Sequence, residues 1–163
     1  MTGPLASELA QDFLDLLRYL NQEEAEYLVV GGYAVNFYGY SRATEDLDVW
    51  INTSRANATR VWKALEYFGL PPGIVLPDLR GSDEPPPTGF RFGRRPISVD
   101  LLTSIEGVEF GEAWKARRIV TLDEVKINMI GLEALLINKR STGRLRDLAD
   151  AAELTREPKT KRP

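Results

Sequence analysis

Two aspartates separated by a single residue are the first feature of this sequence that suggests chemistry. Asp46 and Asp48 alternate with Leu47, Val49 and Ile51. On a β-strand alternate side chains share a face, so the three apolar residues would enter a core while both carboxylates point to the other side. Like charges placed so repel each other, and a pair of divalent cations about 3.5–4 Å apart is one arrangement that relieves the repulsion. An acidic strand end on the surface is the alternative.

A pair of glycines precedes these aspartates in the chain. Gly31 and Gly32 follow the β-prone run Tyr27–Val30, and a short helix is expected directly after them, over about 33–40. Glycines leave room for a ligand beside the backbone, and the free N–H groups of a helix start attract an anion. The turn is therefore a candidate phosphate site, with a ligand-free strand-to-helix turn as the alternative.

A third aspartate, Asp100, stands inside the apolar run Ile97–Leu102. A carboxylate flanked in this way needs a partner, although a strand end or a buried ion pair would also explain it. Thirteen residues separate Gly32 from Asp46, which is enough for one short helix and a turn. The three carboxylates would then converge beside the anion site. Because carboxylates beside a phosphate need cations, the combination predicts a metal–triphosphate site.

These motifs resemble those of the DNA polymerase β-type nucleotidyltransferase superfamily over about residues 27–103. Gly31-Gly32, where many members have Gly-Ser, is similar to the lincosamide nucleotidyltransferases and the small bacterial AbiEii-like toxin nucleotidyltransferases. The resemblance implies transfer of a nucleoside monophosphate from a nucleoside triphosphate to a hydroxyl acceptor, with release of pyrophosphate. It implies that Asp46, Asp48 and Asp100 are the catalytic residues and the ligands of Mg²⁺ or Mn²⁺. The backbone of the two glycines would hold the phosphates.

A weaker resemblance covers residues 136–150, which are similar to the C-terminal helical segment of the AbiEii-like members. It implies that Lys139 approaches the nucleotide phosphates, whereas a solvated basic helix end is the alternative. Arg42 and Thr44 precede the aspartate strand and are predicted to contact the nucleotide, although a polar turn explains them equally well. On the last helix, ion pairs along the helix surface are expected among Arg144, Arg146, Asp147 and Asp150.

The sequence leaves several classes of acceptor molecule open. A toxin-like enzyme would modify a tRNA, another RNA or a protein hydroxyl and would have a cognate antitoxin, whereas a resistance-type enzyme would modify a small hydroxylated molecule. A non-catalytic binding or antitoxin module on the same fold is a further alternative, which retention of all three aspartates opposes. Two interpretations are open for five further arginines, which would form either an RNA-binding face or a set of solvated strand residues. They are Arg91, Arg94, Arg95, Arg117 and Arg118.

Composition limits the possible chemistry further. The 163 residues include no cysteine and no histidine, which excludes thiolate and imidazole groups as nucleophile, base or metal ligand. Any metal should therefore be a hard, oxygen-binding ion. The net charge of −3 does not favour nucleic-acid binding by the protein as a whole. With neither a signal-peptide pattern nor an apolar run of ~20 residues, we expect a cytoplasmic protein without membrane contact.

The order of periodic segments predicts an α/β (α+β) fold, with a small mixed β-sheet and helices mostly on one face. Strands are expected over 27–30, 47–51, 90–92, 97–102, 119–122 and 125–130, with a turn at Gly93. Helices are expected over about 5–21 and 33–40, from the N-cap Ser54 to Gly69, from Leu132, and on an apolar stripe of Leu145, Leu148, Ala149 and Ala152. One domain should span 1–156, with the catalytic core at 27–103 and a helical segment at 131–156. Asp78–Gly89 is interpreted as a mobile loop and 157–163 as a disordered tail.

Overall fold

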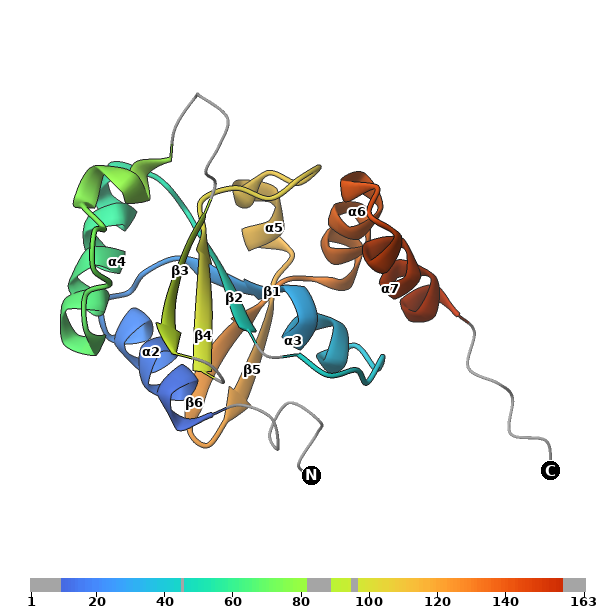
Figure 1. Cartoon of the computed structure of the whole chain (residues 1–163), viewed down its shortest axis with the longest axis horizontal. Coiled ribbons are helices and arrows are strands. Elements are labelled where there is room, and N and C mark those ends of the chain that lie inside the picture. Colours follow the sequence, from blue (N-terminus) through green and yellow to red (C-terminus); the bar gives the residue numbers. More distant parts are fainter. Residues whose placement is uncertain (1–9, 45, 82–88, 95–96, 157–163) are drawn as a thin grey trace.

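The computed structural model describes residues 10–44, 46–81, 89–94 and 97–156. Within them, six strands form one sheet: β1 (Tyr27–Val30), β2 (Asp46–Ile51), β3 (Gly89–Arg94), β4 (Ile97–Leu102), β5 (Arg118–Leu122) and β6 (Val125–Met129). The helices are α2 (Gln11–Gln22), α3 (Gly31–Phe37), α4 (Arg55–Phe68), α5 (Phe110–Lys115), α6 (Leu132–Thr142), α7 (Leu145–Thr155) and the 3₁₀ helix η1 (Leu76–Arg80). Figure 1 shows their arrangement.

The sheet is mixed, and its strand order is β3-β4-β2-β1-β6-β5. The inner strand β2 runs parallel to β4 and antiparallel to β1, which in turn runs parallel to β6. Antiparallel β3 and β5 form the two edges. The predicted α/β class with a mixed sheet is therefore confirmed. Near the site described below, β1 ends at Val30 and β2 begins at Asp46.

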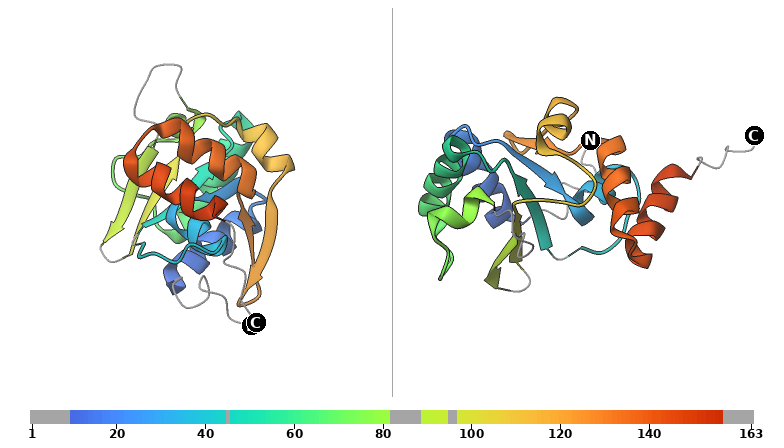
Figure 2. Two further views of the ribbon diagram at one scale, coloured as in Figure 1. Left: turned by 90° about the vertical axis from the view of Figure 1, so that its right-hand side faces the viewer. Right: turned by 90° about the horizontal axis from the view of Figure 1, so that it is seen from above.

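Helices lie on both sides of the strands, rather than mostly on one face as predicted (Figure 2). The two longest, α2 and α4, pack against each other on one face, and Phe13, Leu16 and Leu17 of α2 are fully buried there. The side chain of Ser54 accepts a hydrogen bond from the Asn57 N–H at 3.2 Å, as predicted for the N-cap of α4. The view from above in Figure 2 shows α6 and α7 on the opposite side. None of the helices in the described ranges is long and apolar enough to cross a membrane.

Several predicted boundaries differ from the structure. Helix α2 begins at Gln11, and residues 5–9 of the predicted helix lie outside the described residues. The predicted loop 78–89 overlaps η1 at its start and β3 at its end, and 82–88 are not described, nor is the predicted tail 157–163. The turn predicted at Gly93 was wrong, because this residue pairs with Ser98 inside the β3–β4 ladder. This shift in register changes which residues face each other across the two strands.

Helix α7 exposes its apolar side and buries its acidic side. Leu145 is 86% exposed and Leu148 is 40% exposed, whereas Asp147 and Asp150 are only 5% and 1% exposed. The apolar stripe that was expected to be the core side of this helix therefore faces outward. The acidic side is buried because it meets cations from other parts of the chain, as described next.

Candidate functional site

The site is built on one row of residues that crosses the sheet. Asp48 on β2 is paired with Asp100 on the parallel strand β4, and Asp100 is paired with Arg91 on β3. On the other side of Asp48 lies Val30, the last residue of β1 before the glycine turn. Paired residues in a sheet point to the same face, so the two carboxylates and the arginine are neighbours.

The alternation along β2 explains why its carboxylates are available. Leu47 and Val49 are completely buried, and they face the core formed with α2 and α4. Asp46 and Asp48 are only partly buried on the opposite face, as the sequence pattern predicted. Asp46 also accepts a hydrogen bond from the Ser98 hydroxyl, its partner in the β2–β4 ladder.

Gly31 and Gly32 pack so closely against neighbouring side chains that neither position has room for a Cβ atom. Gly31 has φ +67°, and a Cβ atom there would overlap the Asp48 carboxylate, lying 2.8 Å from its Cγ. A Cβ atom on Gly32 would lie 2.8 Å from the Cβ of Thr44. Helix α3 begins at Gly31 itself rather than after both glycines. The pair therefore brings the start of α3 against the aspartate strand, which no larger residue would permit.

Arg91 binds two of the three carboxylates. Its Nε and Nη2 donate to the two oxygens of Asp100 at 2.8 and 3.0 Å, and Nη2 also donates to Asp46 Oδ2 at 3.1 Å. These contacts with Asp100 and Asp46 raise the pKa of the Arg91 guanidinium. Asp100 was predicted to need a partner, and Arg91 is that partner. The arginine itself remains 56% exposed.

The third carboxylate, Asp48, lies where its ionised form is disfavoured. Burial raises its pKa from 3.8 to about 7, together with the charge of Asp100, a hydrogen bond to it, and the charge of Asp46. The ammonium of Lys139 acts in the opposite direction. A carboxyl in this position gains from a cation, since positive charge nearby favours the ionised form.

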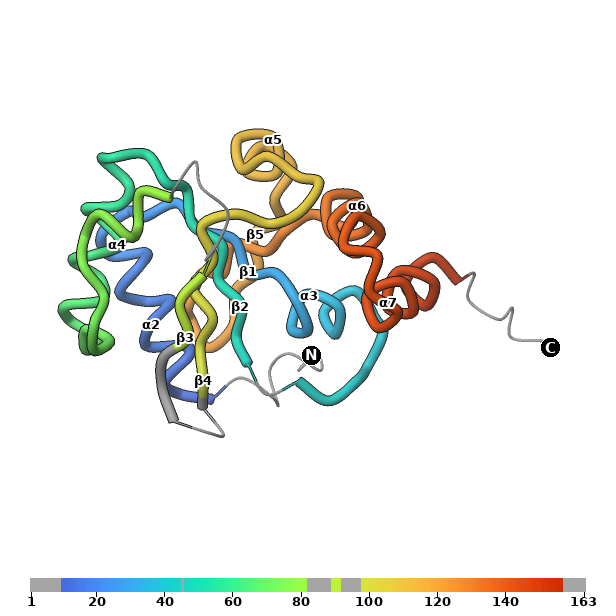
Figure 3. Tube along the Cα trace, turned by 45° about the horizontal axis from the view of Figure 1, so that its top comes forward, coloured from blue at the N-terminus to red at the C-terminus, as the bar shows by residue number. Residues whose placement is uncertain are grey.

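A buried network of charges closes the site from the C-terminal helices. Lys139 Nζ lies 3.0 Å from both Asp147 Oδ1 and Asp150 Oδ2, and all three side chains are at most 7% exposed. Asp150 also binds Arg42, whose Nη2 donates to Oδ2 at 3.0 Å. Arg144 Nε donates to Asp147 at 2.7 Å, as predicted, whereas the predicted pairing of Asp150 within its own helix was wrong. The network joins α6 and α7 to the segment before β2 (Figure 3).

The hydrogen bonds of Asp147 keep it ionised despite its position. Burial alone would raise its pKa, but hydrogen bonds from Thr142 and Lys139 and the charge of Lys139 outweigh this effect and lower the pKa below 3.8. Lys139 is therefore shared between two carboxylates. It also borders the same cavity as Asp48, where the prediction placed it.

All eight residues predicted for the site line one cavity of about 570 Å³. They are Gly31, Gly32, Arg42, Thr44, Asp46, Asp48, Asp100 and Lys139. The carboxylates of β2 and β4 form one wall, and basic side chains from α6, α7 and the segment before β2 form another. Four charged residues that were not predicted for the site also line it: Arg91, Arg144, Arg146 and Asp147. A correct β3–β4 register would have indicated Arg91, because it pairs directly with Asp100.

A second cavity of about 740 Å³ shares five lining residues with the first: Gly31, Asp48, Lys139, Arg144 and Asp147. Its remaining lining is mixed. Leu102 and Ile105 contribute apolar surface, whereas Ser104, Glu106 and Asn138 contribute polar groups. Both cavities therefore open onto the same aspartate.

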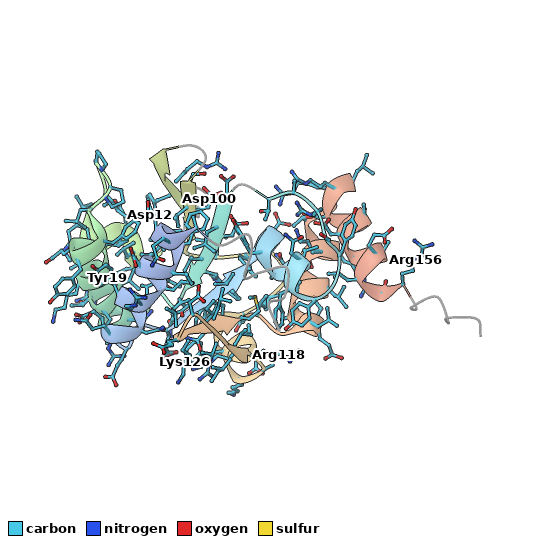
Figure 4. The ribbon with its side chains drawn as sticks, turned by 90° about the horizontal axis from the view of Figure 1, so that it is seen from below. Asp12, Tyr19, Asp100, Arg118, Lys126 and Arg156 are labelled. Carbon is cyan, nitrogen blue, oxygen red and sulfur yellow. The ribbon has the colours of Figure 1, made fainter. Side chains whose placement is uncertain are left out.

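The arginines considered as an RNA-binding face do not gather on one surface. Arg91 lies on the edge strand β3, whereas Arg118 begins β5 at the other edge of the sheet. In Figure 4, Asp100 and Arg118 lie on opposite sides of the molecule. The guanidinium of Arg117 lies 3.7 Å from the ring centre of Trp114, and that of Arg118 lies over Phe37. Nothing is described of Arg95 or of the side chain of Arg94.

The donor chemistry of the site suits a divalent cation, but the carboxylates are not arranged around one. Asp46, Asp48 and Asp100 supply the oxygen donors that Mg²⁺ and Mn²⁺ prefer. Within the described residues, however, no group of three or more acidic side chains is positioned to hold a metal ion as it stands. Arg91 bridges Asp46 and Asp100 instead. Metal binding would therefore require this arginine to move.

Comparison of the sequence with protein-family models gives no match. Comparison with curated proteins gives no significant match either.

Proposed function

We propose that the protein is a metal-dependent nucleotidyltransferase, which moves a nucleoside monophosphate from a nucleoside triphosphate to a hydroxyl acceptor. The observation that supports this most is the composition of the first cavity. Three carboxylates from β2 and β4 face basic groups from α6, α7 and the segment before β2 across about 570 Å³. This volume falls in the range of small-molecule sites, and the two walls match the two halves of a metal–triphosphate complex.

In this proposal each wall has its own partner. Asp46, Asp48 and Asp100 would hold Mg²⁺ or Mn²⁺, which lowers the pKa of the acceptor hydroxyl and stabilises the charge on the leaving pyrophosphate. The phosphates would face Arg144 and Arg146, whose side chains line the cavity and are exposed.

Other residues would help to position the nucleoside triphosphate, although their charges are already partly neutralised by ion pairs. Lys139 and Arg42 already share Asp150 between them, so they would act on the phosphates through a fixed, partly neutralised network. The backbone of Gly31 and Gly32 borders the same space. Asp100 would assist removal of the acceptor proton, as expected for a carboxylate beside the reacting hydroxyl.

The second cavity is the place proposed for the acceptor. It meets the first at Asp48, and its mixed lining suits a hydroxylated group with an apolar part. A tRNA end, another RNA, a protein side chain and a small hydroxylated molecule all meet this description. The toxin-like form of the proposal adds a cognate antitoxin and a reaction in the cytoplasm.

A label-transfer experiment tests the proposed reaction. Each nucleoside triphosphate, labelled in turn on the α- and the γ-phosphate, is incubated with Mg²⁺ and with total RNA, protein extract or small hydroxylated compounds. We expect α-label on an acceptor, no γ-label, and no transfer by the Asp100→Asn variant. Transfer of γ-label would indicate a kinase. No transfer of either label to any acceptor class would favour a non-catalytic module on this fold.

A further inference from the structure

Two of the three carboxylates of the cluster are ion-paired with one exposed side chain, that of Arg91. It donates three hydrogen bonds to Asp100 and Asp46, with donor–acceptor distances of 2.8–3.1 Å. Of the other cations that line the cavity, Lys139 lies between Asp147 and Asp150, Arg42 binds Asp150 and Arg144 binds Asp147. Among the described residues, the ion pairs of Asp46 and Asp100 are those with Arg91. Arg91 is therefore the described cation that directly neutralises this cluster.

The position of Arg91 makes its contacts replaceable. It lies on the edge strand β3, and 56% of its side chain is exposed. Ion pairs with this exposure contribute little net stability, because water and salt compete for both partners. Long arginine side chains can leave such a contact by rotation about their own bonds, without any change in the backbone. A metal ion could therefore displace the guanidinium, at the cost of these contacts.

The same contacts obstruct a metal ion. The oxygens of Asp46 and Asp100 that Arg91 engages are the ones a divalent cation would need, and no described acidic group holds a metal-ready arrangement. A guanidinium fork and a metal ion use the same lone pairs of a carboxylate, so only one of them can occupy these oxygens.

We propose that Arg91 is the resident counter-ion of the aspartate cluster and competes with divalent cations for Asp46 and Asp100, so that it sets the metal affinity of the site. This inference rests on the proposed function, in which those aspartates bind metal. Arg91 stabilises the cluster before the metal arrives and weakens its binding by the cost of giving up these contacts. The site would then load at a higher cation concentration than three free carboxylates would need.

Binding of Mn²⁺ alone, followed by the electron paramagnetic resonance signal of the free ion, tests this competition. The proteins compared are the wild type, Arg91→Ala, Arg91→Lys and the control Arg60→Ala, which removes an exposed arginine from α4 on the far face. We expect Arg91→Ala to bind Mn²⁺ about tenfold more tightly than wild type, since it removes both a competing fork and a positive charge. Arg91→Lys keeps the charge without the fork and should be intermediate. Arg60→Ala should match the wild type.

Thermal melting provides a second readout that does not depend on activity. In EDTA, Arg91→Ala should melt below the wild type because the aspartates lose their counter-ion, and saturating Mn²⁺ should raise its melting temperature by more than that of the wild type. If Arg91→Ala does not fold without metal, Arg91→Lys gives the same comparison.

The outcomes separate this inference from the proposed function. Equal or weaker Mn²⁺ binding by both Arg91 variants, with measurable binding by the wild type, would overturn the competition and leave the proposed metal site intact. No Mn²⁺ binding by any of the proteins would overturn both.

Discussion

Asp48 and Asp100 occupy the same position on the parallel strands β2 and β4, so two carboxylates lie side by side in the middle of the sheet. Placing the two carboxylates together disfavours the ionised form of Asp48 in the folded protein. Burial and the neighbouring acids raise the pKa of Asp48 to about 7, which shows that the charged form is disfavoured without added positive charge. The cluster is thus poised to be stabilised by a cation, and its behaviour with pH should reveal this.

The pH dependence of stability should differ between wild type and Asp48→Asn in EDTA. Asp48 ionises near 3.8 in the unfolded chain and near 7 in the folded protein, so the folded state binds the proton more tightly. Its contribution to stability is therefore present below about pH 4 and is lost as the pH rises from about 4 to about 7. The isosteric variant lacks this loss and should be more stable above about pH 7, by roughly 2–4 kcal/mol.

Urea unfolding at about pH 4 and about pH 8 measures this difference. Comparing the two proteins at each pH cancels the contributions of acids far from the site, and the difference measures the effect of the Asp48 charge within its cluster with Asp46 and Asp100. A wild-type protein that is equally or more stable than Asp48→Asn at about pH 8 would mean that this carboxylate is already well compensated in the metal-free fold.

Lys139 should be a structural residue as well as part of the site. Lys139→Ala leaves Asp147 and Asp150 buried without their shared cation, and breaking a buried pair in this way costs roughly 3–5 kcal/mol. Arg140, the next residue of α6, is exposed, and Arg140→Ala should change stability by less than about 0.5 kcal/mol. Similar unfolding free energies for both variants would contradict the buried network. Nucleotide binding by Lys139 variants is interpretable only where folding is retained.

The outward apolar stripe and the buried acidic side of α7 give opposite predictions for its substitutions. Leu145→Ser should cost less than about 0.5 kcal/mol, because the leucine is 86% exposed. Asp150→Ala removes a buried carboxylate from both Arg42 and Lys139 and should cost several-fold more, roughly 3–5 kcal/mol. Chemical denaturation of the two variants checks the orientation of the helix directly. If the leucine substitution proved the more damaging, α7 would have to pack with its apolar side inward.

Two glycines with nearly equal φ angles allow the cost of the left-handed conformation to be separated from the cost of steric overlap. Gly31 has φ +67° and Gly143 has φ +70°, but only Gly31 has a neighbour, Asp48, in the place of a Cβ atom. Gly143→Ala should cost about 1–2 kcal/mol for the left-handed conformation alone. Gly31→Ala should cost a further 1–3 kcal/mol from overpacking.

At about pH 4, where Asp48 is protonated in the folded protein, addition of Asp48→Ala to the Gly31→Ala protein should recover most of this further cost, because it removes the overlapping carboxyl group. Thermal or urea unfolding of the three proteins measures both effects. Equal losses for Gly31→Ala and Gly143→Ala would show that the turn and the aspartate strand are not in close contact.

The sequence predicted the sheet and the site well where the signal was local. Alternation in β2 placed Leu47 inward and Asp48 outward, and the glycine pair marked the strand-to-helix turn that packs against them. These features depend on the period of a strand and on the conformational freedom of glycine. Both are properties of a few neighbouring residues.

The errors concern the register of one strand pair and a contact between distant segments. Arg91 was not assigned to the site because the turn was placed at Gly93, whereas the pairing of Arg94 with Ile97 brings Arg91 opposite Asp100. Helix α7 was oriented by its apolar stripe, although Arg42 lies 108 residues before Asp150 and supplies the charge that buries it. Single-sequence periodicity contains no information on such partners, and so buried ion pairs can reverse the expected face of a helix.

Calorimetric titration of nucleotides tests the central claim, that the aspartate cavity binds a triphosphate through a divalent cation. The non-hydrolysable α,β-methylene analogue of each nucleoside triphosphate is titrated into wild type and Asp48→Asn, in Mg²⁺ and in EDTA. We predict that the wild type binds at least one analogue in Mg²⁺ and loses this binding in EDTA, and that Asp48→Asn binds it at least about tenfold more weakly. Binding of equal strength in EDTA, or by Asp48→Asn in Mg²⁺, would contradict the account.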